Sequence, residues 1–415
     1  MEQTETTIVD GTQHHVHVRH LVLRGTNFEI GRALAEVGIQ RHGRSADRHL
    51  RSDPRYVRAR RAYIRQAYPI HTERMRGVAA AFGLDPEDGR YDFSLLMIGV
   101  DMPQLAMMPP LGCSVVYYPP SATAQGSAYL SRNFDFSTGT VADVLGMPPT
   151  ADMEPMVRHP YILELHPTDG GYASIAIQAY DLLSGTLDGM NEAGLVVSIM
   201  ADEEAMAQIY ELHPGAPRAV GLHELQVMRY LLDTCATAAE AQQALLHLNQ
   251  YYQLVPCHYI VGDRHGSSFV FEHSTGRNVQ HIIDGNAQPQ AVTNFQLHRH
   301  PSRDTMPGGS LTLQNNASWR YARLEERIQR PGARFEEADM KVTNASVSVA
   351  ELFHALDGDP AQNSIAAGSL TRTLWHSLYH VDARTVAFDF YLGEHTPGDL
   401  NTEIRSGYHE FTLAA

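Results

Sequence analysis

The chain has 415 residues, of which 43% are hydrophobic and 19% are charged. That composition is ordinary for a globular protein, and the length suits one large domain or two smaller ones. The formal net charge of -15 argues against non-specific nucleic-acid binding, so we expect no nucleic-acid partner.

Cysteine usage indicates the compartment. Three cysteines, Cys113, Cys235 and Cys257, are too few for a disulfide framework and fit a reducing environment. The first residues, MEQTETTIVDG, lack the basic and apolar stretches of a secretory signal. The longest apolar runs, such as 95–100, are far shorter than the roughly 20 residues that cross a membrane. We therefore expect a cytoplasmic protein without membrane segments.

The N-terminal region reads as one strand followed by helices. Residues 15–23 alternate between polar and apolar side chains and then become apolar, which predicts a strand. Thr26 and Glu29 have the spacing of a capping box, and apolar residues follow at helical spacing. Residues 46–82 predict further helix, with Pro54 at a helix start.

The pattern changes after residues 109–112, where Pro-Pro-Leu-Gly interrupts regular structure immediately before Cys113. Short β-rich runs then dominate, and helices lie between groups of strands. The predicted strands are 114–118, 128–132, 161–165, 172–180, a pair within 187–200, 258–261, 268–272, 290–294, 374–380 and 385–392. The predicted helices are 222–248, 318–328 and 347–356. This layout predicts an α+β fold.

Cys113 is the candidate nucleophile, although a cytosolic cysteine is more often a small buried hydrophobe. Gly112 precedes it, a predicted strand follows it, and the motif Arg132-Asn133-Phe134-Asp135 ends the next predicted strand. In these residues the sequence resembles the N-terminal-nucleophile (Ntn) hydrolases related to acyl-coenzyme A:6-aminopenicillanic acid acyltransferase. Choloylglycine hydrolases and penicillin V acylases are more distantly similar.

Further short segments resemble the same family and occur in its order along the chain. They are 25–31, 76–79, 189–195, 293–294, 318–321 and 373–377. The resemblance implies a four-layer αββα sandwich, in which two antiparallel sheets pack face to face between helical layers. The residues by themselves predict only a mixed α+β fold.

The resemblance also implies that the chain cuts itself between Gly112 and Cys113. The fragments 1–112 and 113–415 would then remain in one folded unit. The freed α-amine has an ordinary pKa of roughly 7.7–8.0 and would accept the proton of the thiol. The thiolate would attack an acyl carbonyl and form a thioester, which water or an amine resolves.

Four further residues receive roles from the resemblance. Asp135 would hold the α-amine or orient the thiol, and Arg132 would lower the thiol pKa and hold Asp135. Asn294 is a candidate oxyanion donor, and Arg320 would complete the network. Each residue alone has a plainer interpretation, as a strand-end salt bridge, a turn former or a solvated side chain.

One position departs from the choloylglycine branch. That branch places a further oxyanion donor after the segment equivalent to 189–195, and the residue here is Ala201. A side-chain donor is thus missing, and a backbone N–H would serve instead. This difference favours the acyltransferase-like branch over a bile-salt or penicillin V assignment.

The expected reaction is transfer of an acyl group to an amine or to water. The substrate would be a small-molecule amide, thioester or amine, with acyl-coenzyme A among the candidate acyl donors, and we expect no cofactor. We also expect no metal, because no carboxylate or cysteine completes a ligand set with the histidines near residues 14–20. Two alternatives stay open: a pure amidohydrolase, and an uncleaved, catalytically silent binding protein of the same fold. The oligomeric state is not predicted.

Overall fold

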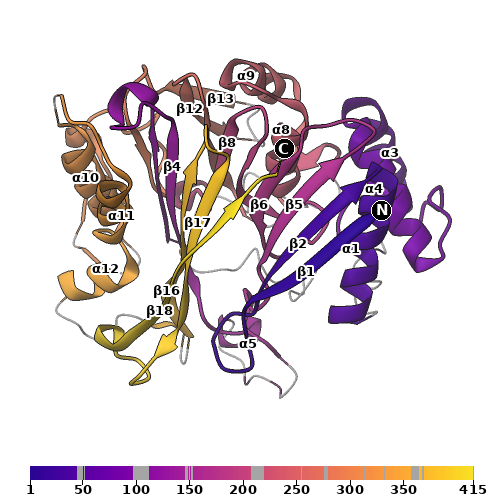
Figure 1. Cartoon of the computed structure of the whole chain (residues 1–415), viewed down its shortest axis with the longest axis horizontal. Helices are drawn as coiled ribbons and strands as arrows, with labels where there is room; N and C mark the ends of the chain where they lie inside the picture. Colours follow the sequence, from indigo (N-terminus) through magenta and orange to yellow (C-terminus); the bar gives the residue numbers. More distant parts are fainter. Residues whose placement is uncertain are drawn as a thin grey trace.

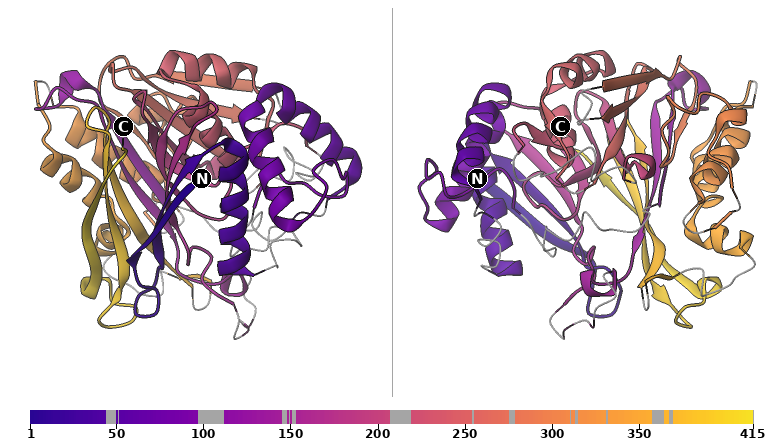
Figure 2. Two further views of the ribbon diagram at one scale, coloured as in Figure 1. Left: turned by 45° about the vertical axis from the view of Figure 1, so that its right-hand side comes forward. Right: turned by 180° about the vertical axis from the view of Figure 1, so that it is seen from behind.

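The computed structural model consists of two sheets packed face to face, with helices on the outer side of each (Figure 1). It describes residues 1–43, 50, 52–96, 112–144, 148, 150, 153–206, 219–253, 255–274, 279–309, 311–312, 315–330, 332–356, 364–366 and 369–414. The order helix, sheet, sheet, helix is also evident from behind (Figure 2). This architecture is the αββα sandwich of the Ntn hydrolases.

The first sheet has nine strands in the order β1-β2-β5-β6-β7-β8-β11-β12-β13. Among the strands of this sheet that the structure describes, only the β2–β5 pair is parallel. The strands are β1 (Glu2–Val9), β2 (Val18–Gly25), β5 (Tyr161–Pro167), β6 (Ser174–Gln178), β7 (Thr186–Asn191), β8 (Leu195–Ala201), β11 (Cys257–Asp263), β12 (Ser268–Ser274) and β13 (Val279–Asp284). A small parallel pair, β9 (Leu222–His223) and β10 (Gln250–Tyr251), lies apart from it.

The second sheet has seven strands and is antiparallel. Six follow the order β14-β3-β4-β16-β17-β18, and β15 pairs with β16. The strands are β3 (Gly112–Tyr118), β4 (Tyr129–Ser137), β14 (Gln290–Val292), β15 (Ser364–Ala366), β16 (Ser369–His380), β17 (Thr385–Glu394) and β18 (Glu403–Thr412). The strand that begins at Gly112 is therefore second from one edge.

The helices form the two outer layers. The first sheet is covered by α1 (Asn27–His42), α3 (Pro54–Ala67), α4 (Pro69–Phe82), α8 (Glu224–Thr234) and α9 (Ala238–His247). The second is covered by α10 (Ala317–Ile328), α11 (Glu337–Ala345) and α12 (Val349–Ala355). The short helical turns α5 (Val141–Val144) and α6 (Glu203–Met206) lie in connections.

The main core fills the space between the sheets. Phe134 of β4 stacks on Trp375 of β16 with ring centroids 4.1 Å apart, and also on Phe136. Burial of each such side chain stabilises the fold by roughly 1.5–3 kcal/mol. A second apolar cluster, which includes Tyr118 and Leu324, joins the outer face of the second sheet to its helices.

Helix starts follow the predicted capping chemistry. The Thr26 hydroxyl accepts the N–H of Glu29, and the Glu29 carboxylate accepts the N–H of Thr26, so the capping box is confirmed. Pro54 begins α3 behind an Asp53 cap. Within the described part of the predicted helical region 46–82, Pro69 has no N–H to continue α3 and instead begins α4; residues 46–49 and 51 lie outside the described residues.

The region 222–248 is also two helices rather than one. Helix α8 ends at Thr234, and the hydroxyl of Thr237 accepts the N–H of Glu240 to begin α9. Cys235 lies at this break and is buried. The apolar face predicted for the first part, which includes Leu225 and Leu231, is buried as expected.

Three edge strands of the two large sheets were not predicted: β1, β13 and β18. The hairpin of 374–380 and 385–392 was predicted as the last element of the chain, whereas β18 follows it. Few side chains of these three strands are buried, so none of them has a regular apolar alternation. Helix α11 was missed as well.

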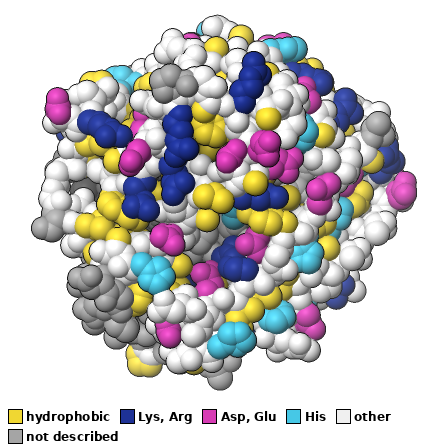
Figure 3. Space-filling model, turned by 60° about the vertical axis from the view of Figure 1, so that its left-hand side comes forward, with side chains coloured by type: hydrophobic (Ala, Val, Ile, Leu, Met, Phe, Trp, Pro, Cys, Tyr) yellow, Lys and Arg dark blue, Asp and Glu magenta, His cyan; other side chains and the backbone are white. Residues whose placement is uncertain are grey.

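The outer face of the α10–α12 layer carries a mixture of charges. Basic, acidic and apolar side chains alternate over it, as Figure 3 shows. Arg323 lies over the ring of Trp319, 4.8 Å from its centroid. Within the described parts of the chain, no helix combines the length and apolar character needed to cross a membrane.

Candidate active site

Cys113 lies at the start of β3 and is 3% exposed. Its N–H donates to Oδ1 of Asn294 at 2.8 Å, and its carbonyl oxygen accepts from the guanidinium of Arg320. The backbone of Cys113 is therefore held on both sides by side chains that the sequence singled out. Those side chains come from residues far along the chain.

Arg132 of β4 reaches from the second sheet to the first. Its Nη2 is 3.5 Å from Sγ of Cys113 and donates to the carbonyl of Ile199 at 2.9 Å. Its Nη1 pairs with Asp188 on β7, and both side chains are buried. Burial raises the pKa of the Cys113 thiol above its ordinary value, although the charge and hydrogen bond of Arg132 act in the opposite direction. Arg132 thus acts on the thiol pKa in the expected direction, and burial outweighs its effect.

Asp135 is not held by Arg132, contrary to the sequence expectation. The two residues are three positions apart on one strand, and side chains at an odd spacing point to opposite faces. Thr373 donates its hydroxyl to Oδ1 of Asp135 at 2.7 Å, and Arg320 lies 4.0 Å from Oδ2. Burial raises the pKa of Asp135, while the nearby Arg320 acts to lower it.

Asp135 also lies against the predicted cleavage site. It pairs directly with Gly112 in the β3–β4 ladder. A Cβ atom on Gly112 would lie 2.8 Å from both Cβ and Oδ2 of Asp135. Glycine is therefore the residue that this position accommodates without displacement.

Asn294 follows β14 and connects three parts of the site. Its Oδ1 accepts the Cys113 N–H and Nη2 of Arg320, the latter at 2.8 Å. Its Nδ2 donates to the carbonyl of Ala201 at 2.8 Å. Since an amide nitrogen carries two N–H groups, the contact with Ala201 occupies one and leaves one for a ligand. Arg320 is itself held by Asn316, whose Oδ1 accepts its Nε at 2.6 Å.

Asp188 was not identified from the sequence. It binds Arg132, and it accepts the hydroxyl of Ser377 at 2.6 Å, so it joins both sheets behind the thiol. Asp188 directly precedes the family-like segment 189–195, and Ser377 lies within 373–377. The proximity of Asp188 and Ser377 to family-like segments was the only sequence feature that could have indicated them. Their contact with each other depends on how the two sheets face each other, which the sequence does not indicate.

Glu203 was also missed. It lies two residues after Ala201, and its backbone N–H donates to the carbonyl of Asn294 at 2.9 Å. Burial raises the pKa of its carboxyl group to about 7, and the charge of Arg320 opposes that rise. An appreciable share of Glu203 is therefore protonated near neutral pH, in which form it can donate a hydrogen bond.

Tyr180 adopts an unusual backbone conformation close to the first sheet. Its φ angle is 68°, and the Asp181 N–H donates to the Ala179 carbonyl at 2.8 Å across it. Such a positive-φ turn is rare outside glycine, and comparable strain gathers at functional sites. Burial, and then the neighbouring Cys113, raise the pKa of its hydroxyl. Nothing in the sequence pattern marks this residue.

Among the residues described, no cluster of three His, Cys, Asp or Glu side chains has the geometry of a metal site. Cys235 and Cys257 are buried and free. Burial raises the pKa of Cys235 to about 11, and burial also raises the pKa of Cys257 well above its ordinary value. Neither has the contacts that surround Cys113.

The structure thus brings Cys113, Arg132, Asn294 and Arg320 together inside an αββα sandwich, the architecture of the Ntn hydrolases. Residues 122–394, more than half of the chain, match the family model of acyl-coenzyme A:6-aminopenicillanic acid acyl-transferase. The chain belongs to this family and is an enzyme of the amide-cleaving and acyl-transferring kind. The matched region begins after Cys113, so the match does not include the candidate nucleophile.

Solved structures of similar proteins include a hydrolase, an acylase and an amidase. They are a mutant of conjugated bile acid hydrolase from Clostridium perfringens (12% identity, 72% of this chain and 92% of that chain, TM-score 0.48), penicillin V acylase from Agrobacterium tumefaciens (19%, 67% and 83%, TM-score 0.42) and the Caenorhabditis elegans ortholog of N-acylethanolamine-hydrolyzing acid amidase (14%, 65% and 92%, TM-score 0.34). No curated protein matches the chain.

Proposed function

We propose that the protein is a self-processing cysteine enzyme that forms an acyl thioester on Cys113 and transfers the acyl group to an amine or to water. The observation that carries the proposal is the binding of Cys113 on all sides. Asn294 accepts its N–H, Arg320 donates to its carbonyl and Arg132 contacts its sulfur.

The first step would be cleavage after Gly112. The Cys113 sulfur attacks the Gly112 carbonyl carbon, the Gly112–Cys113 C–N bond breaks, and the thiol proton goes to the leaving nitrogen. Water then hydrolyses the resulting thioester and releases the carboxylate of Gly112. Asp135 lies directly opposite Gly112, beside the bond that would break, and burial raises its pKa.

Cleavage would convert the Cys113 N–H into an α-amine. The amine would retain the hydrogen bond to Oδ1 of Asn294 and would take the thiol proton, a role that the peptide nitrogen cannot fill. The Arg132 charge would then favour the thiolate. Activation and processing are thus the same event.

The oxyanion of the acylation step would need two donors. One is the remaining N–H of Asn294 Nδ2. The second would replace the side chain missing at Ala201, and a backbone N–H is the candidate in that place. A donor of this kind contributes about 3 kcal/mol of transition-state stabilisation.

The substrate would be a small-molecule amide or thioester, with an acyl-coenzyme A among the candidate acyl donors and an amine or water as acceptor. We propose a reducing, cytoplasmic setting, because the three cysteines are unpaired and the nucleophile is a thiol.

Intact mass and denaturing electrophoresis of the purified chain test the processing step. We expect fragments 1–112 and 113–415, and one uncut species for Cys113→Ala. A single full-length species that remains unacylated by p-nitrophenyl acetate would identify the chain as a silent binding protein and overturn the proposal.

The same ester separates transfer from hydrolysis. Acyl-enzyme formed from p-nitrophenyl acetate is divided into two samples, with and without glycine as the amine acceptor, and a denatured acyl-enzyme with glycine gives the uncatalysed rate. Formation of N-acetylglycine above that rate and at the expense of acetate supports transfer. Acetate alone in both samples identifies a pure amidohydrolase.

A further inference from the structure

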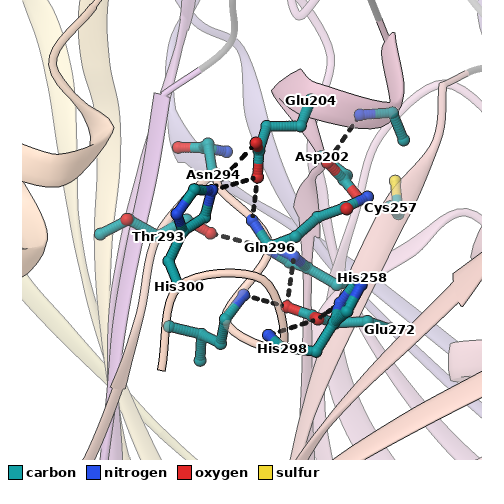
Figure 4. A network of polar contacts seen from close by, with 12 residues as sticks. Asp202, Glu204, Cys257, His258, Glu272, Thr293, Asn294, Gln296, His298 and His300 are labelled. Carbon is teal, nitrogen blue, oxygen red and sulfur yellow. Dashed lines mark hydrogen bonds and ion pairs between the residues drawn. The ribbon is translucent and has the colours of Figure 1, made fainter. Parts of the chain in front are cut away.

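The segment 293–298 carries Asn294 into the site and is held at both ends by side chains of the first sheet. It leaves β14 at the edge of the second sheet and passes beside β11 and β12, as Figure 4 shows. Residues 293–298 are referred to below as the Asn294 segment. Its position decides where the amide of Asn294 meets Cys113.

Glu272 of β12 binds the far end of the segment. Its Oε1 accepts the N–H of Leu297 at 2.6 Å. Its Oε2 accepts the N–H of His298 at 3.1 Å and contacts Nδ1 of the same ring at 2.5 Å. Glu272 is 1% exposed, so these contacts replace water as its partners.

His258 binds the near end. It lies directly opposite Glu272 in the β11–β12 ladder. Its Nε2 is 2.5 Å from the carbonyl of Thr293, and its Nδ1 is 3.7 Å from Oε1 of Glu272. One pair of facing side chains therefore fixes residues 293, 297 and 298.

The charge of Glu272 is maintained although the residue is buried. Burial alone would raise its pKa, but the hydrogen bond from the His298 ring, the neighbouring His258 and the two backbone N–H groups bring it below the ordinary value. A carboxylate that accepts several N–H groups holds a loop more firmly than a neutral acceptor does.

The middle of the segment has further supports. The N–H of Gln296 donates to Glu204 at 2.9 Å, and its side chain donates to Asp202 at 2.7 Å. Glu204 is 23% exposed and also binds His300, whereas Asp202 is 2% exposed. The carbonyl of Asn294 accepts the N–H of Glu203 at 2.9 Å. The contacts of Glu272 and His258 at the two ends add to these supports.

We infer that Glu272 is a positioning residue for the reaction: through the Asn294 segment it sets the amide of Asn294 against Cys113 and the Ala201 carbonyl. The inference rests on the proposed function, since Asn294 matters to catalysis only when Cys113 is the nucleophile. Glu272 itself touches no reacting atom. Its effect is therefore expected in the rate of acylation and not in the capture of substrate.

The test compares Glu272→Gln with Glu164→Gln. Glu164 on β5 belongs to the same sheet and is a buried carboxylate between His20 and His166, at 3.2 and 2.6 Å. It is thus a matched Glu–His cluster that lies outside the Cys113 network. Both variants are assayed for the maximal rate of acylation by p-nitrophenyl acetate, its apparent KM and amide hydrogen exchange.

For Glu272→Gln we expect the maximal acylation rate to fall at least about tenfold, with KM within about threefold and faster exchange across 293–298; a tenfold fall equals about 1.4 kcal/mol. Glu164→Gln should leave the rate within about twofold. Glu272→Asp keeps the charge on a shorter side chain, and its maximal acylation rate should lie between those of the wild type and Glu272→Gln. It also serves as the folded variant should Glu272→Gln not fold.

Two outcomes overturn the inference, and they are distinguishable. An active wild-type enzyme whose acylation rate and segment exchange are unchanged by Glu272→Gln overturns the positioning role alone. If the Cys113→Ala variant retains the turnover of the wild type, the proposed function is overturned, and the positioning role with it.

Discussion

Gly112 and Asp135 face each other across the β3–β4 ladder, and the space between them admits no Cβ atom on Gly112. The carboxylate therefore lies beside the peptide bond that the proposed processing would break. The identity of the residue at position 112 is therefore constrained, as is that of the candidate nucleophile Cys113.

Replacement of Gly112 by alanine is expected to slow self-cleavage. The added methyl group would displace Asp135 or shift β3, and either change misplaces the Cys113 sulfur. We expect the rate to fall by at least about tenfold, or about 1.4 kcal/mol in the barrier. Time-resolved electrophoresis of the newly made chain measures it. Gly308, around which an added Cβ meets no atom within 4 Å, provides the control Gly308→Ala. Equal cleavage rates in the two variants would contradict the prediction.

Loss of the Arg132 charge is expected to raise the thiol pKa further and to destabilise the fold. In Arg132→Gln the buried carboxylate of Asp188 loses its partner, at a cost of about 3–5 kcal/mol in the free energy of unfolding. The pH midpoint of Cys113 alkylation by iodoacetamide should move up by about one pH unit.

The matched control for Arg132 is Arg74→Gln, which removes an equally buried arginine. It should destabilise the chain in urea but leave the alkylation midpoint in place. A midpoint that moves equally in both variants would show that general loosening, and not the Arg132 charge, tunes the thiol.

Asp233 is expected to hold the N-terminal helices to the rest of the molecule. It accepts from Arg74 of α4 at 2.5 Å and from Arg229 at 3.0 Å, and it binds the hydroxyl of Tyr68. Asp233→Asn should lower the free energy of unfolding by about 3–5 kcal/mol, measured by urea denaturation.

An exposed pair sets the scale for Asp233. Arg32 and Glu36 form an i,i+4 ion pair in which both side chains are more than half exposed. Glu36→Gln should change the free energy of unfolding by no more than about 0.5 kcal/mol. If Asp233→Asn costs as little, the buried cluster does not join the two fragments.

Glu203 predicts a pH dependence of stability. Its pKa in the folded chain is about 7 against an ordinary value of 4.5, so the folded chain binds the proton more tightly. The stabilisation is complete below pH 4.5 and is lost as the pH rises through 7. Glu203→Gln should therefore match the wild type at low pH and exceed it at pH 8, by roughly 3 kcal/mol at most. A difference that is constant from pH 5 to pH 8 would contradict the raised pKa.

Much of the fold could be predicted from local sequence patterns. The capping box at Thr26, the helix start at Pro54 and most central strands follow from spacing and side-chain type. The helix breaks at Tyr68 and Cys235 could not be predicted, because the apolar periodicity continues across them. The polar edge strands could not be predicted either, because they lack apolar periodicity.

The candidate site was also predicted in part. Cys113, Asn294 and Arg320 were recognised because each lies in a short motif, and the structure brings them into contact. The partner of Arg132 was assigned incorrectly, since the true partner, Asp188, comes from the opposite sheet. A contact between layers leaves no trace in the spacing of residues along one strand.

The contacts of Cys113 have a consequence for the order of events in the cell. Asn294 and Arg320 are synthesised long after the Gly112–Cys113 bond, yet both bind the residue at that bond. A chain whose activation needs these contacts cannot be switched on while it is still emerging from the ribosome, nor after truncation before Arg320. Self-cleavage would then activate only those molecules in which both sheets have formed.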